Sequence, residues 1–286
     1  MYNIIPKGKQ EEVIALPAKG HIVVLGTAGS GKTTIALLRA FHLANLPDSP
    51  NVLLVTFNGA LVEYMRGISN FRTGNLVVES YHKFARGYLN YRAKMPRCNA
   101  ILGPDEKAYY IGKAVETLKK QYPTESTFRR SDEFFIDEIT FIEKFGFADL
   151  GSYNEAERIG RAAANVKREN RKWIYAVYKK YIELREEAGR KYDWDDLALY
   201  AYRELQDDDN ERRYTHIIVD EGQDFSPMMI KSLVAAVADG GSFTFFGDVA
   251  QQIYGSRLSW RDSGINADKI RSEERRVGKE CRSRWS

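Results

Sequence analysis

Eight consecutive residues constrain this chain more than any other feature: Gly26-Thr27-Ala28-Gly29-Ser30-Gly31-Lys32-Thr33. The run fits the phosphate-binding pattern G-x-x-x-x-G-K-[ST], in which glycines let successive backbone N–H groups turn toward phosphate oxygens. An apolar run over residues 21–25 predicts a buried strand before it, and apolar positions three and four apart over residues 34–44 predict a helix after it. This context favours a nucleotide site over the alternative, a glycine-rich turn without a ligand.

Each part of this pattern has an expected partner on a bound nucleotide. Lys32 is expected to reach the β- and γ-phosphates, and the Thr33 hydroxyl is expected to ligate Mg²⁺, at the positive end of the following helix. The expected nucleotide contacts extend one residue further, to Thr34. Upstream, the amide of Gln10 could hydrogen-bond an adenine edge. The alternative is a solvated glutamine at a helix start, and Gln10 taken by itself favours that alternative.

Length and composition exclude several classes of protein. The 286 residues suffice for one large domain or two modest ones with a real core. No run of 18 apolar residues occurs and the N-terminus lacks a signal-peptide pattern, which predicts a soluble, cytoplasmic protein without a membrane partner. Two cysteines in this length argue against a disulfide framework and against a zinc cluster.

The last sixteen residues, 271–286, differ from everything before them. Nine of the sixteen are charged, and the run resembles one reading frame of a common short-read sequencing adapter. We therefore expect the natural sequence to stop near Ile270; a basic tail that grips nucleic acid is the alternative. The tail holds six Lys or Arg and three Glu, so the net charge falls from +4 to +1 without it. Whole-chain charge then no longer argues for nucleic acid.

Alternating strands and helices predict an α/β fold with a parallel sheet flanked by helices on both faces. Further buried strands are expected over residues 51–57, 76–80, 214–219 and 242–246. Residues 87–192 show a helical pattern with many aromatic residues, which we expect to form the core of an inserted all-α subdomain. The expected sheet domain is therefore in two parts, residues 1–86 and 193–270. The helical insertion is expected over residues 87–192 and the tail over residues 271–286.

The expected strand over residues 214–219 runs directly into Asp220 and Glu221. Two acids at the end of a buried strand suit a phosphate loop, because Mg²⁺ binds few carboxylates and keeps several waters. Asp220 is expected to hold the Mg²⁺ shell, and Glu221 is expected to polarise the attacking water.

From these acids onward the sequence resembles a known family, the UvrD/Rep/PcrA group of superfamily 1 DNA helicases. Residues 219–227 resemble its motif II, with Asp-Glu followed by Gln-Asp, and residues 246–255 resemble its motif III, usually Gly-Asp-x-x-Gln-Ser-Ile-Tyr. Four further matches occur in the family's order along the chain. Gln10 stands at the adenine-reading position, and residues 55–58 resemble motif Ia. Residues 80–84 resemble the family's Thr-Phe-His-x-Phe, and residues 192–197 resemble the Asp-Phe-Asp-Asp-Leu that marks the return from the inserted domain.

The resemblance implies a RecA-like P-loop NTPase domain, 1A, interrupted by a helical domain, 1B, and a protein that uses ATP and Mg²⁺. Carried over by position, Lys32 would act in catalysis while Thr33 and Asp220 hold the Mg²⁺. Glu221 would be the catalytic base, and Gln251 would sense the γ-phosphate and link it to bound DNA.

The family contacts single-stranded DNA at the positions of Phe57, Asn58, His82, Tyr254 and Arg257. Aromatic faces stack on any base, which suits a motor that moves along DNA without reading its sequence. The alternatives are core packing for Phe57 and Tyr254, and a structural cap or a buried hydrogen bond for His82.

Three positions depart from the family's motifs. Gln252 replaces the usual Ser of motif III. Ser256 stands where close relatives have a base-stacking Trp, which puts one contact of the DNA track in doubt. Gly222 replaces a more usual Ala or aromatic residue of motif II.

The resemblance implies an ATP-dependent DNA helicase or translocase with 3′-to-5′ polarity that acts on single-stranded DNA or on a single-strand/double-strand junction. The family's motifs IV to VI and its second RecA-like domain do not occur in this sequence. Because that domain supplies arginines to the nucleotide, the chain alone is expected to bind Mg-ATP weakly, to hydrolyse it poorly and not to unwind DNA. The alternatives are a DNA-dependent ATPase switch or accessory subunit in repair or anti-phage defence, a small-molecule P-loop kinase, and a non-functional truncated product.

Overall fold

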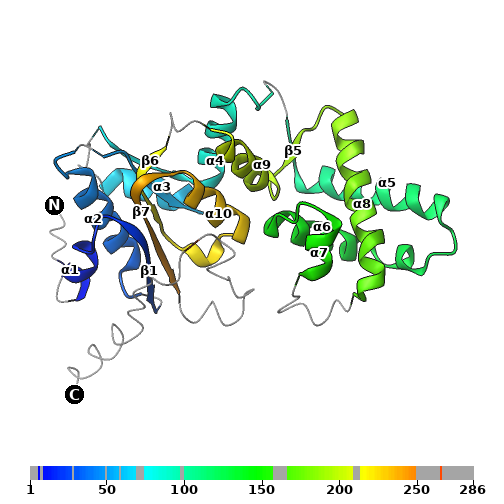
Figure 1. The fold of residues 1–286 in the computed structure, drawn as a ribbon, viewed down its shortest axis with the longest axis horizontal. Helices are drawn as coiled ribbons and strands as arrows, with labels where there is room; N and C mark the ends of the chain where they lie inside the picture. Colours follow the sequence, from blue (N-terminus) through cyan, green and yellow to red (C-terminus); the bar gives the residue numbers. More distant parts are fainter. Residues whose placement is uncertain are drawn as a thin grey trace, which may run out of the picture. The chain divides into compact units, whose positions relative to one another are not determined.

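Two compact units make up the chain in this computed structural model. The sheet unit takes in the described parts of Met1–Phe84 and Leu205–Ser286, and the helical unit is Ala85–Glu204 (Figure 1). For residues 9, 64–66 and 68 the structure describes the backbone only. In all, it describes residues 6, 9–27, 29–48, 50–57, 59–68, 74–96, 100–156, 166–208, 213–248 and 265.

Five parallel strands form the sheet of the sheet unit. All four pairings between neighbouring strands are parallel, which confirms the predicted α/β class. In spatial order the strands are β1 Gly20–Gly26, β7 Val237–Asp248, β6 Tyr214–Val219, β2 Val52–Thr56 and β3 Leu76–Ser80.

Both faces of this sheet are buried, as the continuous apolar strand sequences predict. On one face, Val52, Leu54 and Ile218 join a core with residues of the helix that follows the phosphate loop. Their neighbours Leu53 and Ile217 point to the opposite face and are also fully buried. The helices of the unit are α1 Lys9–Ile14, α2 Lys32–Ala44, α3 Gly59–Ile68, α10 Pro227–Ala235, the 3₁₀ turn η2 Gly222–Asp224 and the start of α4 Tyr81–Tyr91.

The parallel arrangement brings the carboxyl ends of the strands to one edge of the sheet. In the register of β1 and β7, Gly26 lies opposite Asp248. The backbone N–H of Asp220, just after β6, donates to the carbonyl oxygen of Val55 in β2. The residues that follow these strands therefore meet at a shared edge, where open α/β sheets bind ligands.

An aromatic core holds the helical unit together. Phe135, Tyr153, Ile174 and Tyr181 are fully buried in one cluster, which confirms the core expected for this stretch. The helices are the rest of α4, α5 Pro104–Gln121, η1 Ser126–Arg129, α6 Asp132–Phe145, α7 Leu150–Glu155, α8 Arg168–Glu187 and most of α9 Leu197–Gln206. The sequence pattern predicted helix alone, but two short parallel strands also occur, β4 Ile101–Leu102 and β5 Tyr192–Asp193.

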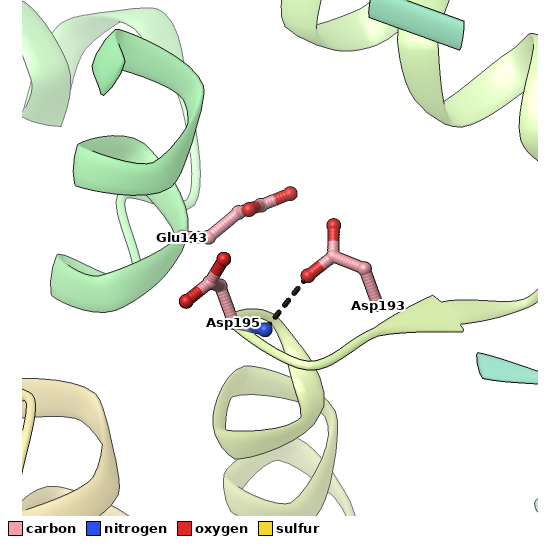
Figure 2. A group of neighbouring side chains, drawn as sticks. All are labelled: Glu143, Asp193 and Asp195. Atoms are coloured by element: carbon pink, nitrogen blue, oxygen red, sulfur yellow. Dashed lines mark hydrogen bonds between the residues drawn. The ribbon is translucent and has the colours of Figure 1, made fainter. Parts of the chain in front are cut away.

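Three carboxylates of the helical unit lie close together: Glu143 on α6, Asp193 on β5, and Asp195 (Figure 2). Their oxygens lie within 4.8 Å of one another, a spacing that could hold a metal ion. The Lys107 ammonium of α5 already lies among them, with Nζ at 2.5 Å from Glu143, 3.3 Å from Asp193 and 2.8 Å from Asp195. Lys107 therefore supplies the positive charge, and the cluster is a buried ion network.

A second buried cation extends this network. The fully buried Arg185 of α8 pairs with Asp193 at 3.1 Å and with Asp196. Although burial opposes it, Lys107 and Arg185 hold the pKa of Asp193 well below its usual range. Burial and the charge of Asp193 raise the pKa of Glu143 well above its usual range and that of Asp196 to about 7. Residues 192–197, which resemble the family's marker after the inserted domain, are thus structural anchors of the helical unit.

Candidate nucleotide site

The phosphate loop joins β1 to α2 at the carboxyl edge of the sheet. Gly29 and Gly31 have φ angles of 74° and 79°, in the left-handed region that favours glycine. A Cβ atom on Gly26 would lie 2.8 Å from the Ser30 hydroxyl oxygen, so the end of the strand also suits glycine. Gly31 directly precedes the 13 residues of α2. The loop therefore leads into the positive end of a helix, which favours a bound anion.

The Lys32 side chain folds back into this loop and is 7% exposed. Its ammonium donates to the carbonyl oxygens of Gly26 at 3.2 Å and Thr27 at 2.9 Å. The carboxylate of Asp248, at the end of β7, lies 3.9 Å away. The loop thus encloses a buried positive charge where the sequence pattern predicts phosphates.

Asp220 follows directly on β6, and its side chain is fully buried. Burial and the neighbouring Glu221 raise the pKa of Asp220 to about 6, while the nearby Thr33 hydroxyl and the Lys32 ammonium act to lower it. The Thr33 contact falls short of hydrogen-bond geometry, and neither carboxylate oxygen accepts a hydrogen bond from any residue that the structure describes. A buried carboxylate with two unsatisfied oxygens beside a threonine hydroxyl fits Mg²⁺, which prefers oxygen ligands.

Glu221 has a left-handed backbone, with φ at 51° and ψ at 43°, which is uncommon for a residue with a side chain. Its Oε2 accepts a 2.6 Å hydrogen bond from Nε2 of Gln223. The other end of the same amide, Oε1, accepts a 3.1 Å hydrogen bond from the backbone N–H of Asp248. Gln223 was not among the expected site residues, although it belongs to the Gln-Asp pair that carries the motif II resemblance.

Phe245, a fully buried residue of β7, fills the space beside two glycines of this site. A Cβ atom on Gly222 would lie 2.1 Å from a carbon of the Phe245 ring, and one on Gly247 would lie 2.6 Å from another. The departure of Gly222 from the family's Ala or aromatic residue therefore has a packing reason, because Phe245 occupies the volume of the missing side chain.

We expect Gly222→Ala to destabilise the sheet unit by about 1–3 kcal/mol, because the added methyl group displaces the Phe245 ring in a packed core. Combining it with Phe245→Leu should recover part of that loss, since the shorter side chain vacates the space. Urea unfolding of both single variants and the double variant measures the coupling. Losses that simply add would contradict the packing account.

Gln10 lies next to the phosphate loop, with its Nε2 3.6 Å from where a Cβ atom on Gly31 would be. Thr34 lies in the first turn of α2. Ala28 and Gln251 fall outside the described residues, so their expected roles stay predictions.

Two of the expected DNA contacts lie together at the carboxyl ends of β2 and β3. The rings of Phe57 and His82 are 5.4 Å apart and meet edge to face. Phe57 also meets the Phe225 ring at 6.2 Å, and 40% of Phe57 is exposed. This exposure exceeds what core packing would leave. The other expected contacts fall outside the described residues: Asn58, Tyr254 and Arg257.

Comparisons with known proteins point to one family. A sequence model of the UvrD/REP helicase N-terminal domain matches residues 7–267. YjcD of Bacillus subtilis (strain 168) is 27% identical over 259 residues, which are 84% of this chain and 32% of that protein. DNA helicase II of Escherichia coli (strain K12) is 25% identical over 90% of this chain and 35% of its own length. ATP-dependent DNA helicase UvrD2 of Mycobacterium tuberculosis (strain ATCC 25618 / H37Rv) is 27% identical over 86% of this chain and 36% of its own length.

The chain spans about a third of the length of the curated relatives it matches. The similarity to each of them nevertheless runs through most of this chain. Among the helices that the structure describes, none combines the length and the apolar character needed to cross a bilayer.

Proposed function

Since this chain belongs to the UvrD/REP helicase N-terminal domain family, we propose that it is the ATP-binding motor part of an ATP-dependent DNA helicase or translocase. One series of contacts carries the proposal. The Lys32 ammonium of the phosphate loop lies 3.9 Å from the Asp248 carboxylate. The Gln223 amide accepts from the backbone N–H of Asp248 at 3.1 Å and donates to the Glu221 carboxylate at 2.6 Å. The loop after β1 and the acids after β6 are therefore connected within one site, which supports a triphosphate bound between them.

In the proposed site, the loop amides and Lys32 bind the phosphates at the start of α2. Thr33 and Asp220 would hold a Mg²⁺ ion, which supplies positive charge beside the phosphates. Glu221 orients the attacking water and accepts its proton. The Gln223 amide donates a 2.6 Å hydrogen bond to the Glu221 carboxylate and so fixes the orientation of that carboxylate.

Equilibrium binding tests this proposal directly. The 286-residue chain is titrated with a fluorescent ATP analogue in Mg²⁺ and in EDTA, and unlabelled ATP is used as the competitor. Saturable binding that Mg²⁺ strengthens is the expected result. Absence of saturable binding at millimolar Mg-ATP would sink the proposal. In a protein that also has the second RecA-like domain, strand displacement separates a helicase from an ATPase switch.

Asp220→Asn is expected to stabilise the empty protein at neutral and alkaline pH. The pKa of Asp220 in the folded protein, about 6, exceeds its ordinary value of 3.8. The folded state therefore holds the proton more tightly, so stability falls as pH rises from about 4 to 6 and stays low above 6. At pH 8 the neutral amide should raise the free energy of unfolding by at most about 3 kcal/mol. Equal thermal stability of the variant and its parent at pH 8 would contradict this account.

The same variant should lose the Mg²⁺ dependence of ATP binding, because an amide is a weaker ligand for Mg²⁺ than a carboxylate. In the unaltered chain, the gain in ATP affinity from Mg²⁺ should shrink as pH falls below about 6, where Asp220 takes up a proton. ATP titrations with Mg²⁺ and with EDTA at pH 5.5 and 8 measure both effects.

We further propose that single-stranded DNA, or a single-strand/double-strand junction, passes over the ends of β2 and β3. The exposed ring of Phe57 beside His82 supports this path, because such rings stack on bases without reading sequence. The 3′-to-5′ polarity and the second RecA-like domain as a partner rest on the family resemblance alone, and the cytoplasmic location rests on the composition of the sequence.

Phe57→Ala should weaken binding of a single-stranded oligonucleotide by about 1–3 kcal/mol, the usual contribution of one base stacked on an aromatic side chain. Fluorescence anisotropy with a labelled oligonucleotide measures the loss, and Mg-ATP affinity serves as the control that should not change. An unaltered oligonucleotide affinity would favour ordinary packing as the role of Phe57.

A further inference from the structure

Arg39 lies on α2, seven residues after Lys32, and is fully buried. Its Nε donates to the Thr244 hydroxyl of β7 at 3.1 Å. Its remaining hydrogen bonds all go to backbone carbonyl oxygens in the segment where α1 ends. These bonds run from Nη1 to Val13, Ile14 and Leu16 at 3.3, 3.1 and 3.0 Å, and from Nη2 to Pro17 at 3.1 Å.

The charge of Arg39 is buried without an ion pair to any carboxylate among the described residues. Burial lowers its pKa to about 10, and none of the described acids acts to raise it, yet it stays charged at neutral pH. Arg39 acts on a titratable neighbour, His216 of β6, whose pKa burial and the Arg39 charge together lower to about 4, so that His216 stays neutral. The guanidinium is therefore stabilised mainly by backbone carbonyls at and just after the end of α1, where the last carbonyls have no acceptor role within the helix itself.

The helix that Arg39 holds is too short to keep its position alone. α1 has six residues, well below the length at which an isolated helix is stable. Apolar packing of Val13 against α2 attaches it to the sheet unit, but such packing has little directionality. The fork of guanidinium hydrogen bonds fixes the orientation, since each bond has a preferred direction.

α1 carries Gln10, whose amide nitrogen lies beside Gly31 of the phosphate loop. Arg39 lies on the same helix as Lys32 and Thr33, the last two residues of the phosphate-binding pattern. One rigid element therefore carries both the phosphate-binding residues and the side chain that sets the position of Gln10.

We propose that Arg39 is a positioning residue for recognition of the nucleotide base: it holds α1 so that the Gln10 amide meets the adenine edge. The inference rests on the proposed function, since it assumes that ATP occupies the loop. Phosphate binding uses Lys32 and the loop amides and does not need α1. Arg39 therefore contributes to the part of the affinity that comes from the base, not to the part that comes from the phosphates.

Arg171 offers a matched control in the helical unit. It is also buried, and its Nη1 donates to carbonyl oxygens where another six-residue helix, α7, ends. Those acceptors are Tyr153 at 2.7 Å, Asn154 at 2.7 Å and Ala156 at 3.2 Å. Arg171→Lys thus damages the same kind of contact in the unit that lacks the phosphate loop.

The experiment compares Mg-ATP with Mg-tripolyphosphate, which has the phosphates and no base, as competitors of a fluorescent ATP analogue. Arg39→Lys should raise the Kd for ATP roughly 3- to 10-fold, the equivalent of one or two weakened hydrogen bonds, and leave the Kd for tripolyphosphate unchanged. Gln10→Ala should show the same split, and the double variant should show no larger effect than either single variant. Arg171→Lys should change neither Kd.

Failure of the unaltered chain to bind either ligand would refute the proposed function and not this inference. If the chain binds both, an Arg39→Lys variant that loses both affinities equally, or neither, overturns the inference. Should Arg39→Lys not fold, Thr244→Val removes only the acceptor of Nε and keeps the carbonyl contacts. A selective loss of ATP affinity in that variant supports the role of Arg39, and an equal or absent effect on the two ligands overturns it.

Discussion

Lys32→Ala should raise the Kd of this chain for Mg-ATP by roughly 100-fold, because charge-assisted hydrogen bonds to the phosphates contribute about 1.5–3 kcal/mol each. The ammonium is already held inside the loop by the carbonyl oxygens of Gly26 and Thr27. It therefore reaches bound phosphates with little further loss of side-chain freedom. Isothermal titration calorimetry, or competition against a fluorescent ATP analogue, measures the change.

Two further variants separate binding from hydrolysis and from general charge effects. Glu221→Gln should keep the Mg-ATP affinity but lower single-turnover hydrolysis by about 10²-fold or more, because the amide cannot accept the proton of the attacking water. Lys83→Ala removes an exposed surface lysine that lies 3.8 Å from Glu79 and should change neither quantity. Wild-type affinity in Lys32→Ala, with the fold intact, would exclude the proposed phosphate site.

The contiguous parts of the site could be predicted from the sequence. The pattern around the phosphate loop predicted a strand and a helix where β1 and α2 are found, and the strands expected over residues 76–80 and 214–219 match β3 and β6 in their bounds. Each of these elements is specified by its own local pattern of apolar residues, and β1 and β6 end at a glycine and at an acid. The parallel sheet then followed from the alternation of strands and helices.

Contacts between distant side chains could not be predicted in this way. No local pattern shows that β7 lies between β1 and β6, and the contact of Asp248 with Lys32 depends on that order. The bridge that Gln223 makes from Glu221 to the backbone of Asp248 depends on it as well. The sequence places Arg39 only within the helix expected over residues 34–44. Most of its acceptors are backbone carbonyls, which every residue has, so no sequence pattern identifies them.

Lys107→Met should lower the stability of the helical unit by about 3–5 kcal/mol, the usual cost of removing one partner from a buried ion network. Methionine keeps the length of the side chain but leaves Glu143, Asp193 and Asp195 without the ammonium that lies within 3.3 Å of each. Arg185 still pairs with Asp193, so the loss should fall mainly on Glu143. Urea unfolding of the isolated variant chains, followed by hydrogen exchange in α5 and α6, locates the loss in this unit.

The pH dependence of that loss distinguishes a charge effect from a packing effect. Burial raises the pKa of Glu143 even beside Lys107, and removal of the ammonium should raise it further. A protonated carboxyl is buried without its cation at a lower cost in folding free energy than a charged carboxylate. The stability difference between Lys107→Met and its parent should therefore shrink as pH falls toward about 5. Lys144→Met removes a half-exposed lysine 3.5 Å from Asp195 and should cost less than about 1 kcal/mol at any pH. A loss in Lys107→Met that is constant from pH 5 to 8 would mean that lost packing, not the unpaired carboxylates, destabilises the variant.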